Sequence, residues 1–245
     1  MNKTVHSARP RRHAAVPAHK AQPRVNDPER TMAGILEAAT AEFGEKGLAG
    51  ARIDEIAAAT RTSKRMIYYY FGSKEGLYLA VLEDAYRHMR AIEGELQLDD
   101  LAPEAALRRL VGFTFDHHHQ HAGFIRLVMS ENMQRGQYLA RSKTLQAMNV
   151  PAIGAIQKLY ARGVASGEFR PGLDAVDIHA SISALTFFNV SNQHSFGLIF
   201  KRDMQAPAVL AARRESIVEM VVRFVRRLPV ESPARASGKN RKEHA

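Results

Sequence analysis

The sequence contains no cysteine, which excludes both a disulfide framework and a metal site built on thiolates. It contains no apolar run of membrane-spanning length. No apolar stretch follows the basic N-terminus, so the chain lacks the pattern of a secretory signal. Together these absences favour a protein of the reducing cytoplasm, and they leave a membrane out of its expected partners.

Acidic residues are missing from residues 1–26, which hold six of the ten net positive charges. Residues 229–245 hold a further two. Both segments are rich in proline and alanine and are predicted to be disordered tails. The N-terminal tail is a solvated terminus, a segment ahead of the true start, or an attractor of nucleic-acid phosphates. The C-terminal tail is interpreted as a solvated terminus.

The hydrophobic pattern is helical, and from Leu101 onward no strand pattern competes with it and no repeat recurs. The predicted helices cover residues 28–47, 53–59, 64–71, 73–96, 103–121, 122–134, 142–166, 174–200 and 207–228. Nine helices with short connections predict an all-α fold. Pro151 is expected to kink the seventh helix, and Pro229 to close the last.

Residues that cap helices support these boundaries. Asp27 precedes a proline at the first helical position, and Ser63 and Ser73 stand where an N-cap hydroxyl belongs. Gly47 is expected to end the first helix in the left-handed conformation. The helix that begins at Ser73 exceeds twenty residues, or about 30 Å, so it can leave a small N-terminal unit and enter a second one.

Residues 52–74 form two short helices joined by a tight turn, and they carry the densest set of groups that grip nucleic acid. Ile53, Ile56 and Ala57 make one apolar face of the first helix. On the second helix, Met66, Ile67 and Phe71 are predicted to face the core. The residues left to face outward are Lys64, Arg65, Tyr68 and Tyr69. Cations at an exposed first turn with phenols beyond them suit the major groove of DNA.

The N-terminal third of the chain resembles the TetR family of bacterial transcriptional regulators. The resemblance covers residues 30–82 and rests on the following motifs: Ile35-Leu36-Glu37-Ala38-Ala39, Phe43, Gly47, Ile56-Ala57, Ser63-Lys64, Ile67-Tyr68-Tyr69-Tyr70-Phe71 and Ser73-Lys74-Glu75. It implies a three-helix helix-turn-helix domain over 27–73, followed by a larger helical ligand-binding and dimerisation domain over 74–228.

The resemblance further implies a homodimer that binds double-stranded operator DNA, represses, and is released by a small-molecule effector, with no cofactor. The helix near Phe187 resembles regulators of aromatic-acid catabolism, which suggests an aromatic acid as effector. A ligand-free architectural DNA binder is an alternative, but it leaves the large second domain without a purpose.

Three arginines depart from the family pattern. Arg61 stands where the family has a turn glycine, so either the turn differs or Arg61 tolerates a strained positive φ. Arg52 replaces the usual Ser or Thr cap, and it is either held by a phosphate or an imperfect cap. Arg65 replaces a small residue and can make a bidentate contact with guanine, worth ~1–3 kcal/mol of discrimination.

Position by position, the resemblance assigns the contacts with DNA. The candidate residues are Arg52, Ser63, Lys64, Arg65, Tyr68, Tyr69 and Lys74. Lys64 and Arg65 are expected at base edges and nearby phosphates, and the tyrosines with Lys74 on the backbone. Tyr70 is expected to pack under the helix instead.

The run His117-His118-His119-Gln120-His121 supports two interpretations. On a helix, His117 and His121 share one face, as two metal ligands should. The run also suits a polar helix end, where histidines favour the dipole. No third ligand stands at a convincing spacing, so no metal site is predicted, although a metal-binding protein or an enzyme using this run is the alternative function. No nucleophile–base pair supports an enzyme.

The second domain holds polar residues at unusual places. Asn189 and Asn192 lie midway along an otherwise apolar helix, and buried amides need partners. Either a bound ligand or a dimer seam supplies them, and the seam is the preferred reason for pairing the last two helices. The candidate ligand contacts are His117, His121, Phe124, Met129, Asn132, Met133, Asn189 and Asn192.

Overall fold

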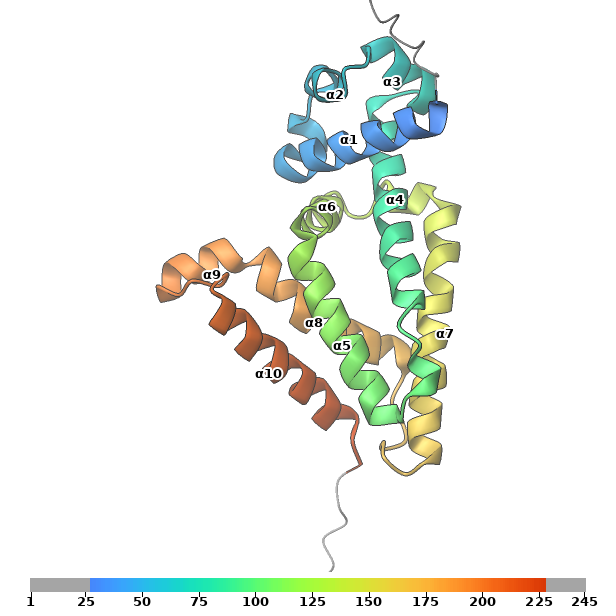
Figure 1. Ribbon diagram of the computed structural model, residues 1–245, viewed down its shortest axis with the longest axis vertical. Coiled ribbons are helices and arrows are strands. Elements are labelled where there is room, and N and C mark those ends of the chain that lie inside the picture. Colours follow the sequence, from blue (N-terminus) through green and yellow to red (C-terminus); the bar gives the residue numbers. More distant parts are fainter. Residues whose placement is uncertain (1–26, 228–245) are drawn as a thin grey trace, which may run out of the picture.

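A computed structural model describes residues 27–227, and these residues are predominantly helical (Figure 1). The helices are α1 (Pro28–Gly50), α2 (Ile53–Thr60), α3 (Lys64–Phe71), α4 (Lys74–Gly94), α5 (Pro103–Gln120), α6 (Ala122–Met133), α7 (Lys143–Ala165), α8 (Ala175–Ser191), α9 (Gln193–Phe200) and α10 (Pro207–Val225). Two short 3₁₀ turns, η1 (Leu98–Asp100) and η2 (Leu139–Arg141), lie between them. The predicted all-α class is confirmed.

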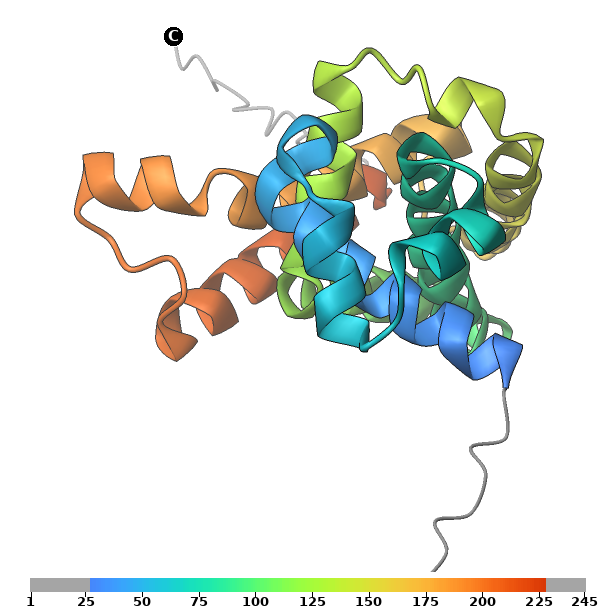
Figure 2. The same ribbon diagram turned by 90° about the horizontal axis from the view of Figure 1, so that it is seen from above.

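The count of nine helices is wrong by one for the described residues, because the helix predicted over 174–200 divides at Asn192. Asn192 has φ −107° and ψ 6°, and its amide nitrogen donates to the hydroxyl of Ser191 at 2.8 Å. After this break α9 extends away from the body of the molecule (Figure 2).

The predicted caps are present. Asp27, Ser63 and Ser73 each accept a hydrogen bond from a backbone N–H in the first turn of the helix that follows. Gly47 adopts the expected positive φ of 65°, but its ψ of 174° is not that of a left-handed cap, and α1 continues to Gly50. Pro151 lies inside α7. Residues 1–26 and 228–245 lie outside the described part, and so do the expected tails and the Pro229 stop.

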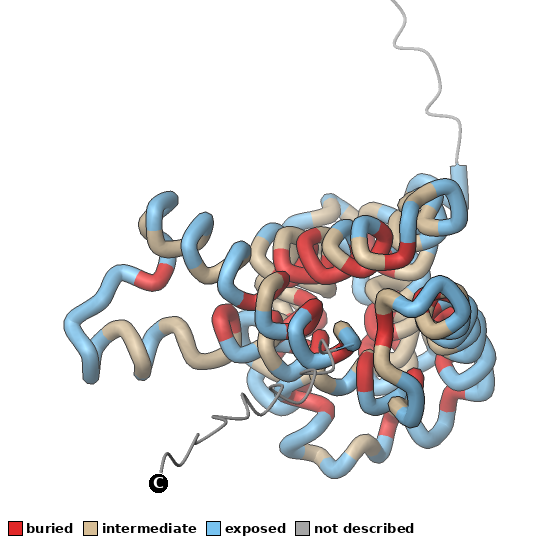
Figure 3. Tube along the Cα trace, turned by 90° about the horizontal axis from the view of Figure 1, so that it is seen from below, coloured by how far each residue is buried: buried red, intermediate tan, exposed pale blue. Residues whose placement is uncertain are grey.

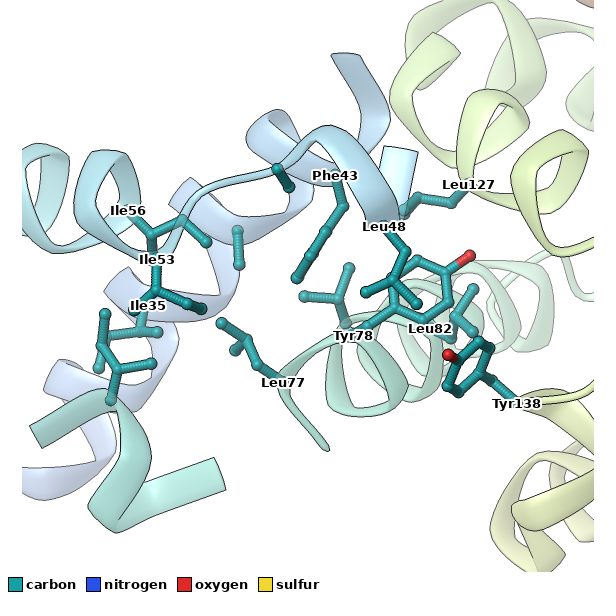
Figure 4. Packing of buried hydrophobic residues seen from close by; sticks show 14 of the residues in the cluster. Ile35, Phe43, Leu48, Ile53, Ile56, Leu77, Tyr78, Leu82, Leu127 and Tyr138 are labelled. Atoms are coloured by element: carbon teal, nitrogen blue, oxygen red, sulfur yellow. The ribbon is translucent and has the colours of Figure 1, made fainter. Parts of the chain in front are cut away.

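Two large apolar cores are joined by α4. The first core lies among α1, α2, α3 and the start of α4, and it draws Leu127 from α6 and Tyr138 from the following loop (Figure 4). The second core lies among α5, α7, α8 and α10. Leu77 of α4 is buried in the first core, and Met89, three turns later, lies in a third small cluster with Phe124. The long helix therefore crosses from one unit into the other.

Candidate nucleic-acid interface and effector cavity

The turn between α2 and α3 is built without glycine. Arg61 takes the left-handed conformation, with φ 53° and ψ 32°, and its backbone N–H reaches the carbonyl oxygens of Ala57 and Ala58. The N–H of Thr62 donates to the oxygen of Ala57 at 3.1 Å, which closes the end of α2. Arg61 thus tolerates a positive φ that glycine would adopt without strain.

The α3 helix turns its cations and two of its three tyrosines to solvent at the far end of the molecule (Figure 1). On the inner face of α3 Ile67 is fully buried, whereas on its outer face the side chain of Tyr69 is 76% exposed. Tyr70 is half-buried and packs against the first core, as expected. The exposed candidates here are Arg52, Ser63, Lys64, Arg65, Tyr68 and Tyr69.

Asp54 lies between two of these cations. Lys64 forms an ion pair with one of its carboxylate oxygens, and Arg52 lies 3.6 Å from the other. The hydrogen bond from Lys64 holds the pKa of Asp54 below its usual range. Arg65, by contrast, forms no ion pair with any other described residue, so its guanidinium is free for a ligand.

Two candidates also serve the fold. The hydroxyl of Ser63 accepts from the N–H of Met66 at 3.2 Å and so caps α3. The ammonium of Lys74 donates to the carbonyl oxygen of Ala49 at 3.3 Å, which ties α4 to the end of α1. Arg52 does not cap α2 through its side chain, and its backbone N–H donates to Glu42 instead.

A cavity of about 630 Å³ opens between the N-terminal unit and the second one. Its walls come from α1, the end of α3, α4, α5 and α6. The lining residues are Glu29, Met32, Ala33, Leu36, Glu37, Thr40, Phe71, Asp84, Ala85, His88, His117, His121, Gly123 and Phe124. Three of the predicted ligand contacts therefore lie together here: His117, His121 and Phe124.

The structure does not bring the other predicted contacts to this cavity. Met129 and Met133 are exposed on α6, and the amide nitrogen of Asn132 donates back to the carbonyl oxygen of Val128 at 2.8 Å. Asn192 forms the break between α8 and α9. Asn189 is buried in the second unit, away from the lining. Helical spacing placed the α6 residues on one helix but could not tell which face the neighbours cover.

Sequence reasoning missed the α1 wall of the cavity. Met32, Leu36 and Thr40 recur at intervals of four, beside the buried stripe of Ile35 and Ala39. The apolar face of α1 is wider than packing against a single core requires, and this width was the signal in the sequence that could have revealed the wall. The acidic residues of this wall had no signal in the sequence, because exposed acids on a helix normally face water.

The histidine rings at the cavity pack against one another and do not point towards a common centre, as metal ligands would. The rings of His117 and His121 lie 4.2 Å apart at 25°, and His88 approaches His121 at 5.8 Å. Across residues 27–227, no three metal-binding side chains gather into a potential site. Burial, with smaller contributions from the imidazoles of His121 and His88 and from Arg90, lowers the pKa of His117 to about 4. This imidazole is therefore neutral at neutral pH.

Polar groups are also buried deeper, between α4, α5 and α8. A ring nitrogen of His118 shares a hydrogen bond of 3.0 Å with the hydroxyl of Thr186, and burial lowers the pKa of His118 to about 4. One turn further along α8, Asn189 is 1% exposed and neither of its amide atoms has a partner. A partner subunit cannot reach so buried an amide, so the seam does not account for Asn189.

Large apolar side chains are exposed along α8, α9 and α10 of the second unit. They are Val176, Phe188, Leu198, Ile199, Phe200, Met220 and Phe224. No residue of α9 is buried, and its arm is drawn in the colours of exposed and intermediate residues in Figure 3. Because α8 packs against both α9 and α10, these exposed side chains lie on neighbouring helices, where they are available for contact with another macromolecule. No helix of the described region combines the length and apolarity needed to cross a bilayer.

Two family models match the chain. The model of bacterial regulatory proteins of the tetR family covers residues 35–81, and that of the tetracyclin repressor-like C-terminal domain covers residues 103–221. Between them they span both units and the helix-turn-helix.

Proteins of known name are also similar to it. The HTH-type transcriptional repressor NicS of Pseudomonas putida is 34% identical over 204 residues, which make up 83% of this chain and 96% of that protein. The HTH-type transcriptional repressor SCO4008 of Streptomyces coelicolor is 39% identical over 140 residues, or 57% of this chain and 64% of that protein. In fold, the ketosteroid transcriptional regulator KstR2 of Mycobacterium tuberculosis superposes with a TM-score of 0.61 at 20% identity, covering 84% of this chain and 98% of that one.

Proposed function

The chain belongs to the TetR family of bacterial regulatory proteins, and from this premise we propose that it is a homodimeric repressor released from operator DNA by a small-molecule effector. The DNA-reading domain is residues 27–73, and the effector and dimer domain is residues 74–228. The observation that carries the proposal is the outer face of α3, where Lys64, Arg65 and Tyr69 stand exposed on a buried Ile67.

Recognition of DNA divides between specific and non-specific contacts. Arg65 has no internal ion pair, so it can offer its guanidinium to guanine in the major groove. Lys64 and Arg52 are drawn to Asp54 in the free protein, and phosphates would compete for them. Tyr69 and Lys74 are placed on the DNA backbone, where contacts set register but carry no sequence information.

A second copy of the chain supplies the other half-site reader. The exposed apolar side chains of α8, α9 and α10 support pairing through this side of the second unit. A symmetric dimer would present two α3 helices about 34 Å apart, one turn of DNA or slightly more. The operator is therefore a pseudo-palindrome.

The effector is proposed to be a small aromatic acid that binds beside His117, His121 and Phe124. The cavity supports this site because it has the volume of a small-ligand pocket and is largely apolar. Its α1 wall belongs to the DNA-reading domain, so an occupant that fits one arrangement of α1 against α6 better than another shifts the population of dimer geometries. Release requires only that the non-binding geometry holds the effector more tightly.

We assign no catalysis or metal binding to the histidine run, since its two cavity histidines stack face to face. NicS, which matches 83% of this chain, is a transcriptional repressor.

The deciding experiment is selection of bound sequences from random double-stranded DNA by the full-length protein. We expect one enriched pseudo-palindrome, protected in a footprint and bound by a dimer. A pool that shows no enrichment over repeated rounds would contradict a sequence-specific regulator.

A further inference from the structure

The side chain of Arg90 on α4 is 13% exposed, and one edge of its guanidinium is unused. Its Nη1 forms an ion pair with Glu93, one turn along the same helix. Its Nε is buried and has no hydrogen-bond partner, and its Nη2 faces only the sulfur of Met89, at 3.7 Å. A thioether is a weak acceptor, so the Nε–Nη2 edge is left without a proper partner.

This open edge has the geometry that a carboxylate needs. A guanidinium binds a carboxylate through two parallel N–H donors, and such bidentate pairs are the strong ones. Glu93 does not use this edge, because it is paired through Nη1. A buried donor without a partner destabilises the free protein, and a ligand oxygen placed there would recover this loss.

Neither Arg90 nor Met89 lines the effector cavity as it stands, and the sulfur of Met89 covers the Nη2 of Arg90. The side chain of Met89 is buried in the same small cluster as Phe124, whose ring lines the effector cavity. Methionine is unbranched and flexible, so it can leave at low cost and refill the space afterwards.

The charges around the cavity set the orientation of an acidic ligand. The cavity lining contains Glu29, Glu37 and Asp84 and no lysine or arginine. A carboxylate would be repelled at this wall and attracted towards Arg90, beside which the imidazoles of His117 and His118 are neutral.

We propose that the Nε–Nη2 edge of Arg90 is the carboxylate receptor of the effector site, and that Met89 leaves this edge when an organic carboxylate binds. The inference rests on the proposed function and specifies its effector as an anion whose charged group lies on α4.

Two substitutions that break the same ion pair test this receptor. The full-length protein and its Arg90→Gln and Glu93→Gln variants are titrated with benzoate, phenylacetate and 2-naphthoate, and with the corresponding primary amides. Binding is read by thermal shift and by release of the selected operator. In the wild type we expect at least one of the acids to bind, and none of the amides at the same concentration.

The two variants should respond in opposite directions. Arg90→Gln should weaken binding of the acid at least tenfold, because the bidentate edge is gone. Glu93→Gln should strengthen it several-fold, because the internal competitor for the guanidinium is gone. If the pair only stabilises the fold, both variants change acid binding in the same direction. That result, or amides that bind as well as acids, or a wild type that binds no acid, overturns the inference.

Further variants separate this inference from folding and from the proposed function. Arg90→Lys keeps the charge without the planar edge, so it should keep the preference for acids over amides with about tenfold weaker binding. Lys158→Gln removes an exposed cation of α7 that is paired with Asp99 outside the cavity lining, and it should change nothing. Operator binding without effector should be the same in all these variants. If the selected operator is bound but Arg90 variants respond normally to acids, the regulator stands and the receptor falls.

Discussion

The N-terminal unit and the interior of the second unit handle their polar groups in opposite ways. On α3 the side chains expected to bind DNA are exposed to solvent. Lys64 and the neighbouring Arg52 both pair with Asp54 in the protein without DNA. In the second unit Arg90 and Asn189 are buried with polar atoms that lack partners. Exposure suits a rigid duplex that binds from outside, whereas unmet hydrogen bonds in a buried place suit a small molecule that enters.

This contrast predicts that a substitution near α3 can abolish DNA binding while the second unit still binds its effector. A Cβ at Gly76 would lie 2.1 Å from the carbonyl oxygen of Phe71, so Gly76→Ala must distort the turn between α3 and α4. We expect loss of specific operator binding, with thermal shifts by aromatic acids retained. Gly34→Ala is the matched control, because a Cβ there meets nothing within 4 Å and α1 should gain up to ~1 kcal/mol. Normal operator binding by Gly76→Ala would refute the argument from the close approach.

Lowering the pH should destabilise the second unit, where His117 and His118 are buried, before it affects the DNA-reading domain. His117 and His118 have pKa values of about 4 in the fold, against an ordinary value near 6.5. Between pH 6.5 and pH 4 the two imidazoles are therefore protonated in the unfolded chain but not in the folded one. The free energy of unfolding falls as the pH drops through this range. Each pKa unit corresponds to about 1.4 kcal/mol, so a loss of a few kcal/mol is expected in denaturant titrations between pH 7 and pH 4.5.

A variant assigns this pH effect to the buried pair. His118→Gln cannot titrate, so its stability should depend less steeply on pH than that of the wild type. The matched control is His194→Gln in α9, an exposed residue, whose pH dependence should equal that of the wild type. Equal slopes for all three proteins would show that His118 does not carry the effect.

Substitutions in the DNA-reading domain should separate a contact that reads the base sequence from contacts with the DNA backbone. Arg65→Ala should cost the operator ~1–3 kcal/mol and relax selection at one base position, with random DNA bound as before. Tyr69→Phe and Lys74→Ala should weaken operator and random DNA alike. Gel-shift titrations on both DNAs measure the difference, and an equal loss for Arg65→Ala would remove it from the base-reading role.

The smallest effect concerns Asn189. Its amide is buried without partners, so Asn189→Leu should raise the free energy of unfolding by ~1–2 kcal/mol. Asn149→Leu is the control, because the Asn149 amide already donates to the carbonyl oxygen of Leu145 at 2.8 Å and its loss should not stabilise. An Asn189→Leu variant no more stable than the wild type would contradict the argument from the unpaired amide.

Patterns set by neighbouring residues predict most of the local structure, and the break at Asn192 is an exception. Ser63 and Ser73 cap the helices that follow them because a hydroxyl meets an N–H three residues along the chain. The period of α3 separated buried Ile67 from exposed Tyr69 for the same reason. The helix over 174–200 was read as continuous because the apolar period runs through Asn192, where only the local backbone geometry reveals the break.

The sequence by itself determined the helical class, most helix boundaries and the outward face of α3, since these follow from hydrogen bonds and periodicities within a few residues. Only the tertiary structure decided that the cavity has an α1 wall, that Met133 points to water and that Arg90 keeps an open edge. Each of these depends on what packs against a helix from another part of the chain. The spacing of residues along one helix carries no information about that neighbour.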